Sequence, residues 1–320
     1  MVCLSYWLYN KFMNNLIVLN KNDNVGVSQF IIPEKTKIEG HEISTIDPIP
    51  FGHKVCLKTI KKGDPIIKYD QIIGFALDDI KPGQHVHSHN LEFREFKRDF
   101  KVTDKKHIID EKADTFFNGI LRDNGQVATR NYIGIVSTVN CSATVTKMIV
   151  ERIKYSDILK DYPNIDGIVP ITHSTGCGMN TESEGMQIFQ RTIDGFKNHP
   201  NFSHVFVIGL GCECAQVSLF DESLKKHNRI HFLTIQDEGG TKKIVEKVLS
   251  QIKNLLSEAN NVQRTSQPVS HLTLALQCGG SDGYSGITAN PALGVAADLL
   301  VKKGGSSILS ETPEIYGAEH

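Results

Sequence analysis

The sequence predicts an α/β protein with a small β-rich domain over residues 14–92 and a doubly wound, mostly parallel α/β domain over residues 115–262. Short β-prone runs separated by turn signals, with no helical period, predict the first domain. From residue 115 onward, short Ile-, Val- and Leu-rich runs alternate with longer amphipathic stretches, which is typical of βαβ units. Residues 93–114 are charged and nearly pattern-free, and we interpret them as a linker.

The composition is that of an ordinary globular protein. Of the 320 residues 40% are hydrophobic and 22% are charged, and the formal net charge is −1. This balance gives no electrostatic reason to expect binding to nucleic acid or to an anionic membrane surface. No apolar run reaches the ~20 residues that a membrane-spanning helix needs. The seven cysteines are odd in number and lack the spacing of a disulfide framework, which favours a reducing, cytoplasmic compartment.

The β-rich domain ends in a run of alternating histidines. His85, His87 and His89 are two residues apart, so on an extended chain they share one face. Three imidazoles on one face can contact a substrate or hold a metal ion, although no fourth ligand is visible nearby in the sequence. A polar face on an edge strand explains the same alternation, and both interpretations stay open.

Apolar runs and amphipathic stretches divide the second part of the chain into expected strands and helices. The expected strands are residues 131–138, 166–172, 204–210, 230–235, 272–277 and 306–310. The expected helices are Ser142–Lys154, Glu182–Phe196, Ala215–Lys226, Thr241–Glu258 and Pro291–Lys303. We interpret residues 263–320 as the start of a further α/β segment that is incomplete at its C-terminal end.

Polar and thiol side chains follow most of these expected strands. Right-handed crossovers place the C-terminal ends of parallel strands at one edge of the sheet, where ligands bind. A single cysteine is more often a small buried hydrophobe, but the same chemistry after several strands favours a shared functional site. The side chains expected at this edge are those of Cys141, His173, Cys177, Cys212, Glu213, Cys278, Asp282 and Glu311.

The stretch QCGGSDGYSGITANPALG, residues 277–294, carries the densest set of such groups. It follows an expected strand, turns through small residues, and leads into a helix expected to begin near Asn290 as N-cap with Pro291 at the first helical position. Backbone N–H groups and the helix dipole then point at one spot, which Ser281 and Asn290 flank. This arrangement suits an anionic, oxygen-rich ligand.

An arginine-containing segment lies just before the first strand of the α/β domain. Asn124-Gly125 is a hairpin turn signal, and Arg130 and Asn131 lead into the strand. The guanidinium group of Arg130 suits a substrate carboxylate, which it can bind through two hydrogen bonds. For Arg122, a surface salt bridge is the better interpretation.

Several of these segments resemble a known family. GHKVCLKTIKKGDPIIKY and IGFALDDIKPGQHVHSHN resemble the N-terminal SAF-type domain of the altronate and galactarate dehydratases. RDNGQVATRNY, HSTGCG, VIGLGCE, QCGGSDGYSGITANPALG and SETPEIYGAEH are similar to segments of the family's main part. The resemblance runs from about Asn15 to His320, and the HVHSHN and ETPEIYGAE segments look closer to the altronate branch. Chains of the family continue well past this point, so we expect a C-terminally truncated chain.

The resemblance implies a hydro-lyase that removes water from a sugar acid, most readily D-altronate to 2-dehydro-3-deoxy-D-gluconate. Family members depend on a divalent metal, so the implied cofactor is Fe²⁺ or Mn²⁺, whereas several thiolates would favour zinc or an iron–sulfur cluster. The candidate metal ligands are His85, His87 and Glu311. The candidate catalytic residues are His173, Asp282 and Cys278, and base and acid are not assigned between them. The candidate substrate-binding residues are Arg130, Asn131, Ser281, Asn290 and Glu213.

Other functions remain open alongside this one. Galactarate dehydratase and sulfolactate sulfo-lyase are activities of neighbouring branches, and a fragment that binds a sugar acid without turnover is an alternative of another class. A nicotinamide oxidoreductase is disfavoured because the Gly209-Leu210-Gly211 turn lacks the third glycine of the dinucleotide fingerprint. The expected partner is a small sugar-acid substrate, and a homo-oligomer remains open.

Overall fold

The computed structural model describes residues 16–96, 115–221, 229–311 and 315. The chain divides into two compact units. The first comprises residues 1–107, 274–299 and 307–320, and the second comprises residues 108–273 and 300–306. Most of the expected linker over residues 93–114 lies outside the described residues.

The N-terminal part is built from strands alone within residues 16–96, which confirms the expected β-rich domain. One antiparallel sheet has the order β1-β2-β3-β6, and a second has the order β4-β5-β7. The strands are β1 (Leu16–Ile17), β2 (Val25–Ser28), β3 (Lys54–Cys56), β4 (Pro65–Lys68), β5 (Gln71–Ala76), β6 (His85–Val86) and β7 (Leu91–Glu92). Buried aliphatic side chains such as Val55, Ile66 and Val86 fill the interior.

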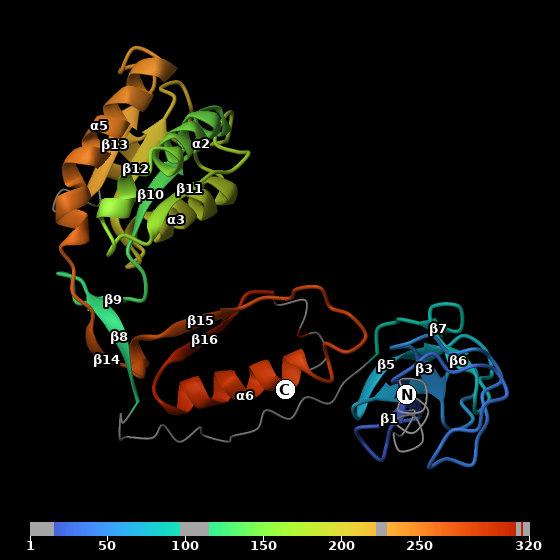
Figure 1. Ribbon diagram of the computed structural model, residues 1–320. Helices are drawn as coiled ribbons and strands as arrows, with labels where there is room; N and C mark the ends of the chain where they lie inside the picture. The colour runs from blue at the N-terminus through green and yellow to red at the C-terminus, as the bar shows by residue number, and fades with distance from the viewer. Residues whose placement is uncertain (1–15, 97–114, 222–228, 312–314, 316–320) are drawn as a thin grey trace. The chain divides into compact units, whose positions relative to one another are not determined.

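The α/β layer is a four-stranded parallel sheet with the order β11-β10-β12-β13 (Figure 1). Its strands are β10 (Tyr132–Ser137), β11 (Gly167–Ile171), β12 (Phe202–Gly209) and β13 (Ile230–Thr234). The helices are α2 (Asn140–Tyr155), α3 (Glu184–Asn198), α4 (Ser218–Asp221) and α5 (Thr241–Asn260), with a 3₁₀ turn, η1, at Ile158–Asp161. The mixed α/β content therefore agrees with the sequence prediction.

Helices cover both faces of this sheet. Apolar residues of α2 and α5, including Ile149 and Val248, pack with Ile133 and Phe206 on one face. Met186 and Phe189 of α3 pack with Val205 and Val207 on the other face. Alternate residues of the central strands therefore enter different cores, and the strands are buried on both sides, as a parallel sheet requires.

A small antiparallel sheet, with the order β14-β8-β9, adjoins the α/β layer within the second unit. Its strands are β8 (Phe116–Leu121), β9 (Val127–Ala128) and β14 (Thr265–Pro268). The turn between β8 and β9 places Gly125 at a φ of 82°, a conformation that glycine adopts without steric cost. The Asn-Gly hairpin expected from the sequence is confirmed.

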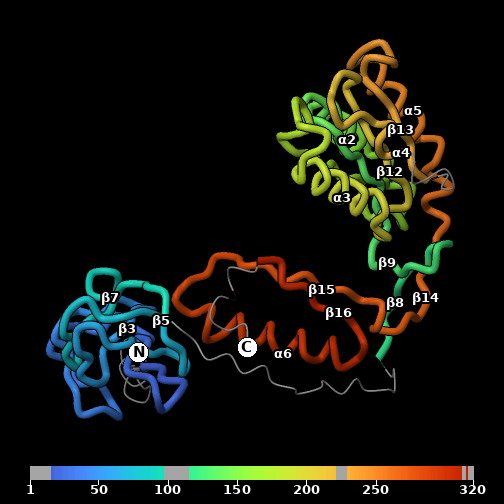
Figure 2. The backbone as a smooth tube through the Cα atoms, turned by 180° about the vertical axis from the view of Figure 1, so that it is seen from behind, coloured from blue at the N-terminus to red at the C-terminus, as the bar shows by residue number. Residues whose placement is uncertain are grey.

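The last segment forms a strand–helix–strand unit with its own two-stranded sheet. It contains a 3₁₀ turn η2 (Val269–His271), β15 (Thr273–Leu276), α6 (Ala289–Lys302) and β16 (Ser306–Leu309), and both views show the two strands alongside α6 (Figures 1 and 2). Backbone hydrogen bonds from Ser306 to Leu272 and from Ser310 to Leu276 show that the strands are parallel.

This separate sheet corrects two predictions. Cys278, Asp282 and Glu311 follow β15 and β16, so they do not belong to the edge of the four-stranded sheet, because only strands of one sheet share an edge. Asn290 is not the N-cap of the last helix, because α6 begins one residue earlier, at Ala289. A shift of one residue is ordinary at helix ends, but it places Asn290 inside the first turn.

Candidate functional site

Four histidine side chains gather on the N-terminal β part. The ring centroid of His85 lies 5.7 Å from that of His87 and 5.3 Å from that of His89, so the expected gathering of the alternating histidines is seen. His53 joins them, with its ring 4.9 Å from that of His87 and its Nδ1 2.9 Å from His85 Nε2. This group, His53, His85, His87 and His89, is called the histidine cluster below.

The pairing of β3 with β6 explains why His53 belongs to the cluster. Val55 pairs with His85 and Lys54 pairs with Val86 in the antiparallel register. One step further along both strands, His53 therefore comes opposite His87. A single sequence does not reveal which strands pair or in which register, so His53 was missed, and its place near the start of the β-prone run GHKVCLKTI was the only available signal.

Burial keeps two imidazoles of the cluster, those of His85 and His53, neutral near pH 7. Burial, helped by His53, His89 and His87, lowers the pKa of His85 to about 4, against a smaller opposing effect of Asp47. Burial also lowers the pKa of His53, with further contributions from His87 and Lys54. A neutral imidazole carries a lone pair that can accept a proton or coordinate a metal ion.

The loop after β15 brings a carboxylate to this cluster. A hollow of about 370 Å³ is lined by His53, Lys54 and His87, together with Asp282 and Tyr284 from the loop. Asp282 Oδ1 accepts hydrogen bonds from the backbone N–H groups of Tyr284 and Ser285, at 2.8 and 3.0 Å. Among the residues that the structure describes, no hydrogen bond occupies Asp282 Oδ2, so this oxygen is available to a ligand.

The other candidates of this segment group with one another. Glu311 Oε2 accepts the backbone N–H of Cys278 at 2.7 Å, and the Cys278 thiol contacts the Ser281 hydroxyl. The backbone N–H of Asn290 donates to the carbonyl of Ser285. Glu311 therefore supports the strand ends of the β15–β16 sheet rather than joining His85 and His87.

The predicted ligand set is consequently not assembled. Among the described residues, no three His, Cys, Asp or Glu side chains are arranged to hold one metal ion. The imidazole nitrogens of His85 and His87 nevertheless fit Fe²⁺ or Mn²⁺ in donor type. The metal stays a prediction.

His173 lies at the C-terminal edge of the parallel sheet, in the second unit. Its Nε2 lies 2.9 Å from the carbonyl oxygen of Ser137, and its Nδ1 lies 3.3 Å from the backbone N–H of Thr175. These partners assign the proton to Nε2, because a carbonyl accepts and an amide donates. Its ring also meets the edge of Phe189, so both nitrogens and the ring orientation are fixed by the protein.

Three of the predicted thiols do share this edge. Cys141, Cys177 and Cys212 are exposed and follow β10, β11 and β12. The first two loops touch, since the backbone N–H of Asn140 donates to Thr175 at 2.9 Å. These three cysteines therefore follow strands of one parallel sheet, as expected, whereas Cys278 follows a strand of another sheet.

Glu213 stabilises the loop after β12. Its carboxylate is buried and accepts hydrogen bonds from the Thr138 hydroxyl and from the backbone N–H groups of Leu210 and Gly211. Burial acts to raise the pKa of Glu213, but these hydrogen bonds outweigh it and the pKa lies below its ordinary value. Because both oxygens are bonded within the protein, this geometry favours a structural role over substrate binding.

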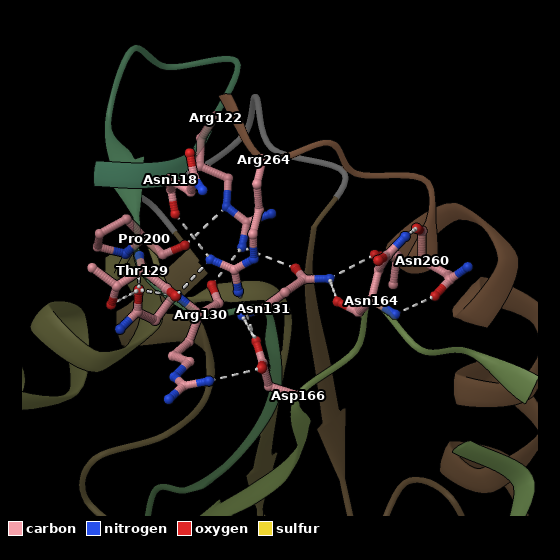
Figure 3. A network of polar contacts seen from close by, with 12 residues as sticks. Asn118, Arg122, Thr129, Arg130, Asn131, Asn164, Asp166, Pro200, Asn260 and Arg264 are labelled. Carbon is pink, nitrogen blue, oxygen red and sulfur yellow. Dashed lines mark hydrogen bonds and ion pairs between the residues drawn. The ribbon is translucent and has the colours of Figure 1, made fainter. Parts of the chain in front are cut away.

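Arg130 and Asn131 lie at the opposite edge of the sheet, before β10 (Figure 3). The fully buried Asn131 amide donates to the carbonyl oxygens of Asn164 and Ala259, each at 2.8 Å, and accepts from Arg122 at 3.0 Å. All of its side-chain polar atoms are therefore bonded. This bonding favours a structural role for Asn131, at the edge of the sheet opposite to His173, and its role in substrate binding stays a prediction.

The arginines of this network also have protein partners. Arg130 forms an ion pair with Asp166 at 3.2 Å, and Arg264 approaches the same carboxylate at 3.5 Å (Figure 3). Arg122 donates to the carbonyl oxygen of Pro200 as well as to Asn131, which replaces the expected surface salt bridge. Burial lowers the pKa of Arg122 to about 10, helped by the neighbouring Arg229, with Asp123 opposing and Arg264 adding to the lowering.

No helix among the described residues combines the length and the apolar composition needed to cross a membrane.

Comparisons with known proteins match nearly the whole chain to one family. The family model described as the altronate/galactarate dehydratase SAF domain matches residues 14–94. The model described as the second domain of D-galactarate dehydratase/altronate hydrolase matches residues 119–260, and the model of the D-galactarate/altronate dehydratase C-terminal part matches residues 269–320. The three matches follow one another in order along the chain.

Relatives give the same result. Altronate dehydratase of Bacillus subtilis (strain 168) is 33% identical over 317 residues, which cover 96% of this chain and 62% of that protein. Altronate dehydratase of Escherichia coli (strain K12) is 34% identical, with 95% and 61% covered. Galactarate dehydratase (L-threo-forming) of Escherichia coli (strain K12) is 35% identical, with 87% and 55% covered. This chain thus spans less than two thirds of the length of these relatives, and it belongs to the altronate/galactarate dehydratase family.

Proposed function

We propose that this chain carries a sugar-acid dehydratase site at the histidine cluster, and that D-altronate is its substrate. The observation that supports this most is the shared hollow of His53, His87, Lys54 and Asp282. It combines two imidazoles, a carboxylate and an ammonium group within one space. The relatives named altronate dehydratase support the substrate class.

The elimination of water requires two proton movements, and tautomerisation of the enol requires a further proton transfer. A base takes the proton from C2, next to the substrate carboxylate, and the C3–O bond breaks as the leaving hydroxyl group takes up a proton to form water. The resulting enol becomes the 2-keto-3-deoxy acid by proton transfer to C3. Positioned acid and base groups contribute ~10²–10⁴-fold to such steps.

The residues of the hollow fit these roles. No hydrogen bond among the described residues occupies Nε2 of His53 or of His87, so either imidazole can accept a proton. Asp282 has its Oδ2 available for a substrate hydroxyl group. The Lys54 ammonium group would attract the substrate carboxylate. Base and acid remain unassigned between the histidines and Asp282.

A divalent ion, Fe²⁺ or Mn²⁺, would act here as a Lewis acid beside the developing enediolate. The imidazoles of His85 and His87 would supply ligands to it, because imidazole suits both ions. The chain's own residues would bind and orient the sugar acid and move its protons.

The test is an incubation of the chain with D-altronate, galactarate and other hexonates, with iron and a reductant, followed by detection of 2-keto-3-deoxy acid. Asp282→Asn and His87→Ala should abolish most product formation. Asp78→Asn and His41→Ala, which change the same residue types outside the hollow, should leave it unchanged. Calorimetric binding of altronate with no product from any substrate would favour a sugar-acid-binding protein and would contradict the dehydratase proposal.

A further inference from the structure

We propose that Tyr284 is a positioning residue that seats the Asp282 carboxylate beside His53 and His87 by clamping the loop after β15 onto the N-terminal β part. This inference rests on the proposed function for its kinetic consequence. The clamp itself is a structural feature of the first unit and can be tested without turnover.

Tyr284 holds the N-terminal β part at two points. Its ring stacks on that of Phe51, with centroids 4.9 Å apart and planes 23° apart. Its hydroxyl group donates a hydrogen bond to the carbonyl oxygen of Ser28 at 2.8 Å. Because one side chain makes both a stacking contact and a hydrogen bond, the position and the orientation of Tyr284 on the N-terminal β part are fixed.

The surface that Tyr284 grips is itself well anchored. Ser28 is fully buried, and its hydroxyl group donates to the carbonyl oxygens of Pro50 and His53. The backbone N–H of Gly52 donates to the Ser28 carbonyl at 3.0 Å. The turn that carries Phe51 and His53 is thus tied to β2, so Tyr284 bonds to the structure that sets the position of His53.

Glycines on both sides of Tyr284 permit this close approach. A Cβ atom at Gly283 would lie 2.8 Å from the carbonyl oxygen of Gly52, closer than real Cβ contacts. A Cβ atom at Gly286 would lie 3.3 Å from the ring of Tyr69, which is also a tight contact. Three positions of the loop, Gly283, Tyr284 and Gly286, therefore fit against the N-terminal β part.

The clamp is coupled to the carboxylate through one turn of backbone. The N–H groups of Tyr284 and Ser285 both donate to Asp282 Oδ1, and the Ser285 hydroxyl group donates to the Asp282 carbonyl at 2.9 Å. This is an Asx-type turn, in which the side chain follows its own backbone. Fixing Tyr284 on Phe51 and Ser28 therefore fixes the Asp282 side chain over the hollow.

The kinetic test is a double-mutant cycle in the full chain. Tyr284→Ala should lower kcat ~100-fold with little change in KM, because a misplaced catalytic group slows the chemical step. Tyr284→Phe keeps the stack on Phe51, so its kcat should fall less than that of Tyr284→Ala. If Tyr284 acts through Asp282, adding Asp282→Asn to Tyr284→Ala should cost little more than either change alone. Tyr155→Ala, at an exposed tyrosine of α2, is the matched control and should change nothing.

Hydrogen exchange supplies a reading that does not depend on turnover. In Tyr284→Ala the backbone N–H groups of residue 284, Ser285 and Gly52 should exchange faster than in the wild-type chain. In Tyr284→Phe the same groups should exchange only slightly faster. Phe51→Ala breaks the stack from the other side and should reproduce the change at Tyr284 and Ser285, which covers the case that Tyr284→Ala does not fold.

The outcomes separate the two proposals. Unchanged exchange in Tyr284→Ala and Phe51→Ala, or fully multiplicative losses of kcat in the cycle, would overturn the clamp. Faster exchange in both variants, with no product from any sugar acid in the wild-type chain, would support the clamp and contradict the proposed function.

Discussion

The histidine cluster and the buried network around Asn131 are both rich in polar side chains, yet they use them in opposite ways. At the network, Asn131 has every polar side-chain atom bonded to the protein. At the cluster, Nε2 of His87 and Oδ2 of Asp282 have no hydrogen bond among the described residues. Spare hydrogen-bonding capacity, rather than the density of polar residues, distinguishes a site for a ligand from a structural support.

The largest expected effect is on turnover at the cluster. Asp282→Asn should lower kcat by ~10²–10⁴-fold, the range for loss of a positioned acid or base, while the melting temperature hardly changes. Steady-state kinetics and thermal unfolding of the same preparation check this. Wild-type turnover in Asp282→Asn would place the chemistry elsewhere in the chain.

The matching change at the network should affect stability. Asn131→Ala removes three buried hydrogen bonds and leaves the carbonyl oxygens of Asn164 and Ala259 without this partner. We expect a loss of about 3 kcal/mol in the free energy of unfolding, because buried polar groups left unpaired cost ~1–3 kcal/mol each. Urea unfolding measures it, and Asn254→Ala on the exposed face of α5 is the control. A change below ~0.5 kcal/mol, as at ordinary surface positions, would contradict the structural role.

A third comparison concerns acid stability. The pKa of His85, in the cluster, and that of His204, buried in the second unit, are each lowered to about 4, chiefly by burial. Between about pH 6.5 and pH 4 the unfolded chain therefore binds more protons at these residues than the folded chain, so the free energy of unfolding should fall as the pH falls through this range.

His204→Gln should flatten this pH dependence, and His85→Gln should do so less, since His85 is more exposed to solvent. Urea unfolding at pH 7, at pH 5 and at about pH 3 gives the slope of the free energy of unfolding against pH in each range. The pKa of Glu213 is lowered as well, so it also makes stability fall as the pH falls, but only at a pH below the ordinary range of a glutamate. A slope confined to that lower range would assign the acid lability to Glu213 instead.

The smallest effect is expected at Arg130. Its side chain is 59% exposed in the ion pair with Asp166, and such surface pairs are worth ~0–1 kcal/mol. Arg130→Gln should therefore leave both stability and KM nearly unchanged. A large rise in KM for the sugar acid would restore Arg130 as a carboxylate-binding residue and would weaken the contrast drawn between the two regions.

The sequence predicted the elements better than their assembly. Periodicity located the β-rich part and the strands around Ile133 and Phe206, because burial on one or both faces leaves a pattern in the residues themselves. It did not show that β15 and β16 form their own sheet, since strand pairing is a long-range property. For the same reason His53 was not among the predicted residues, whereas His87 and Asp282 were.

The sequence also left open what particular side chains bond to. Glu213 was a candidate because it follows an expected strand, and Asn131 because it leads into one beside Arg130. Both are buried side chains whose polar atoms are hydrogen-bonded within the protein. Coordinates are needed to reveal partners such as Ala259 for Asn131 and Thr138 for Glu213, because these residues lie far away in the sequence.

The most direct test of the account is a cycle of His53→Gln and Asp282→Asn, followed by kcat on D-altronate. These residues come from distant parts of the chain and line one hollow. If they act in one site, the double variant should be slower than the slower single variant by less than about threefold, because the residues of one catalytic unit are not additive. Losses that simply multiply would show independent action and would contradict a site shared by the histidine cluster and Asp282.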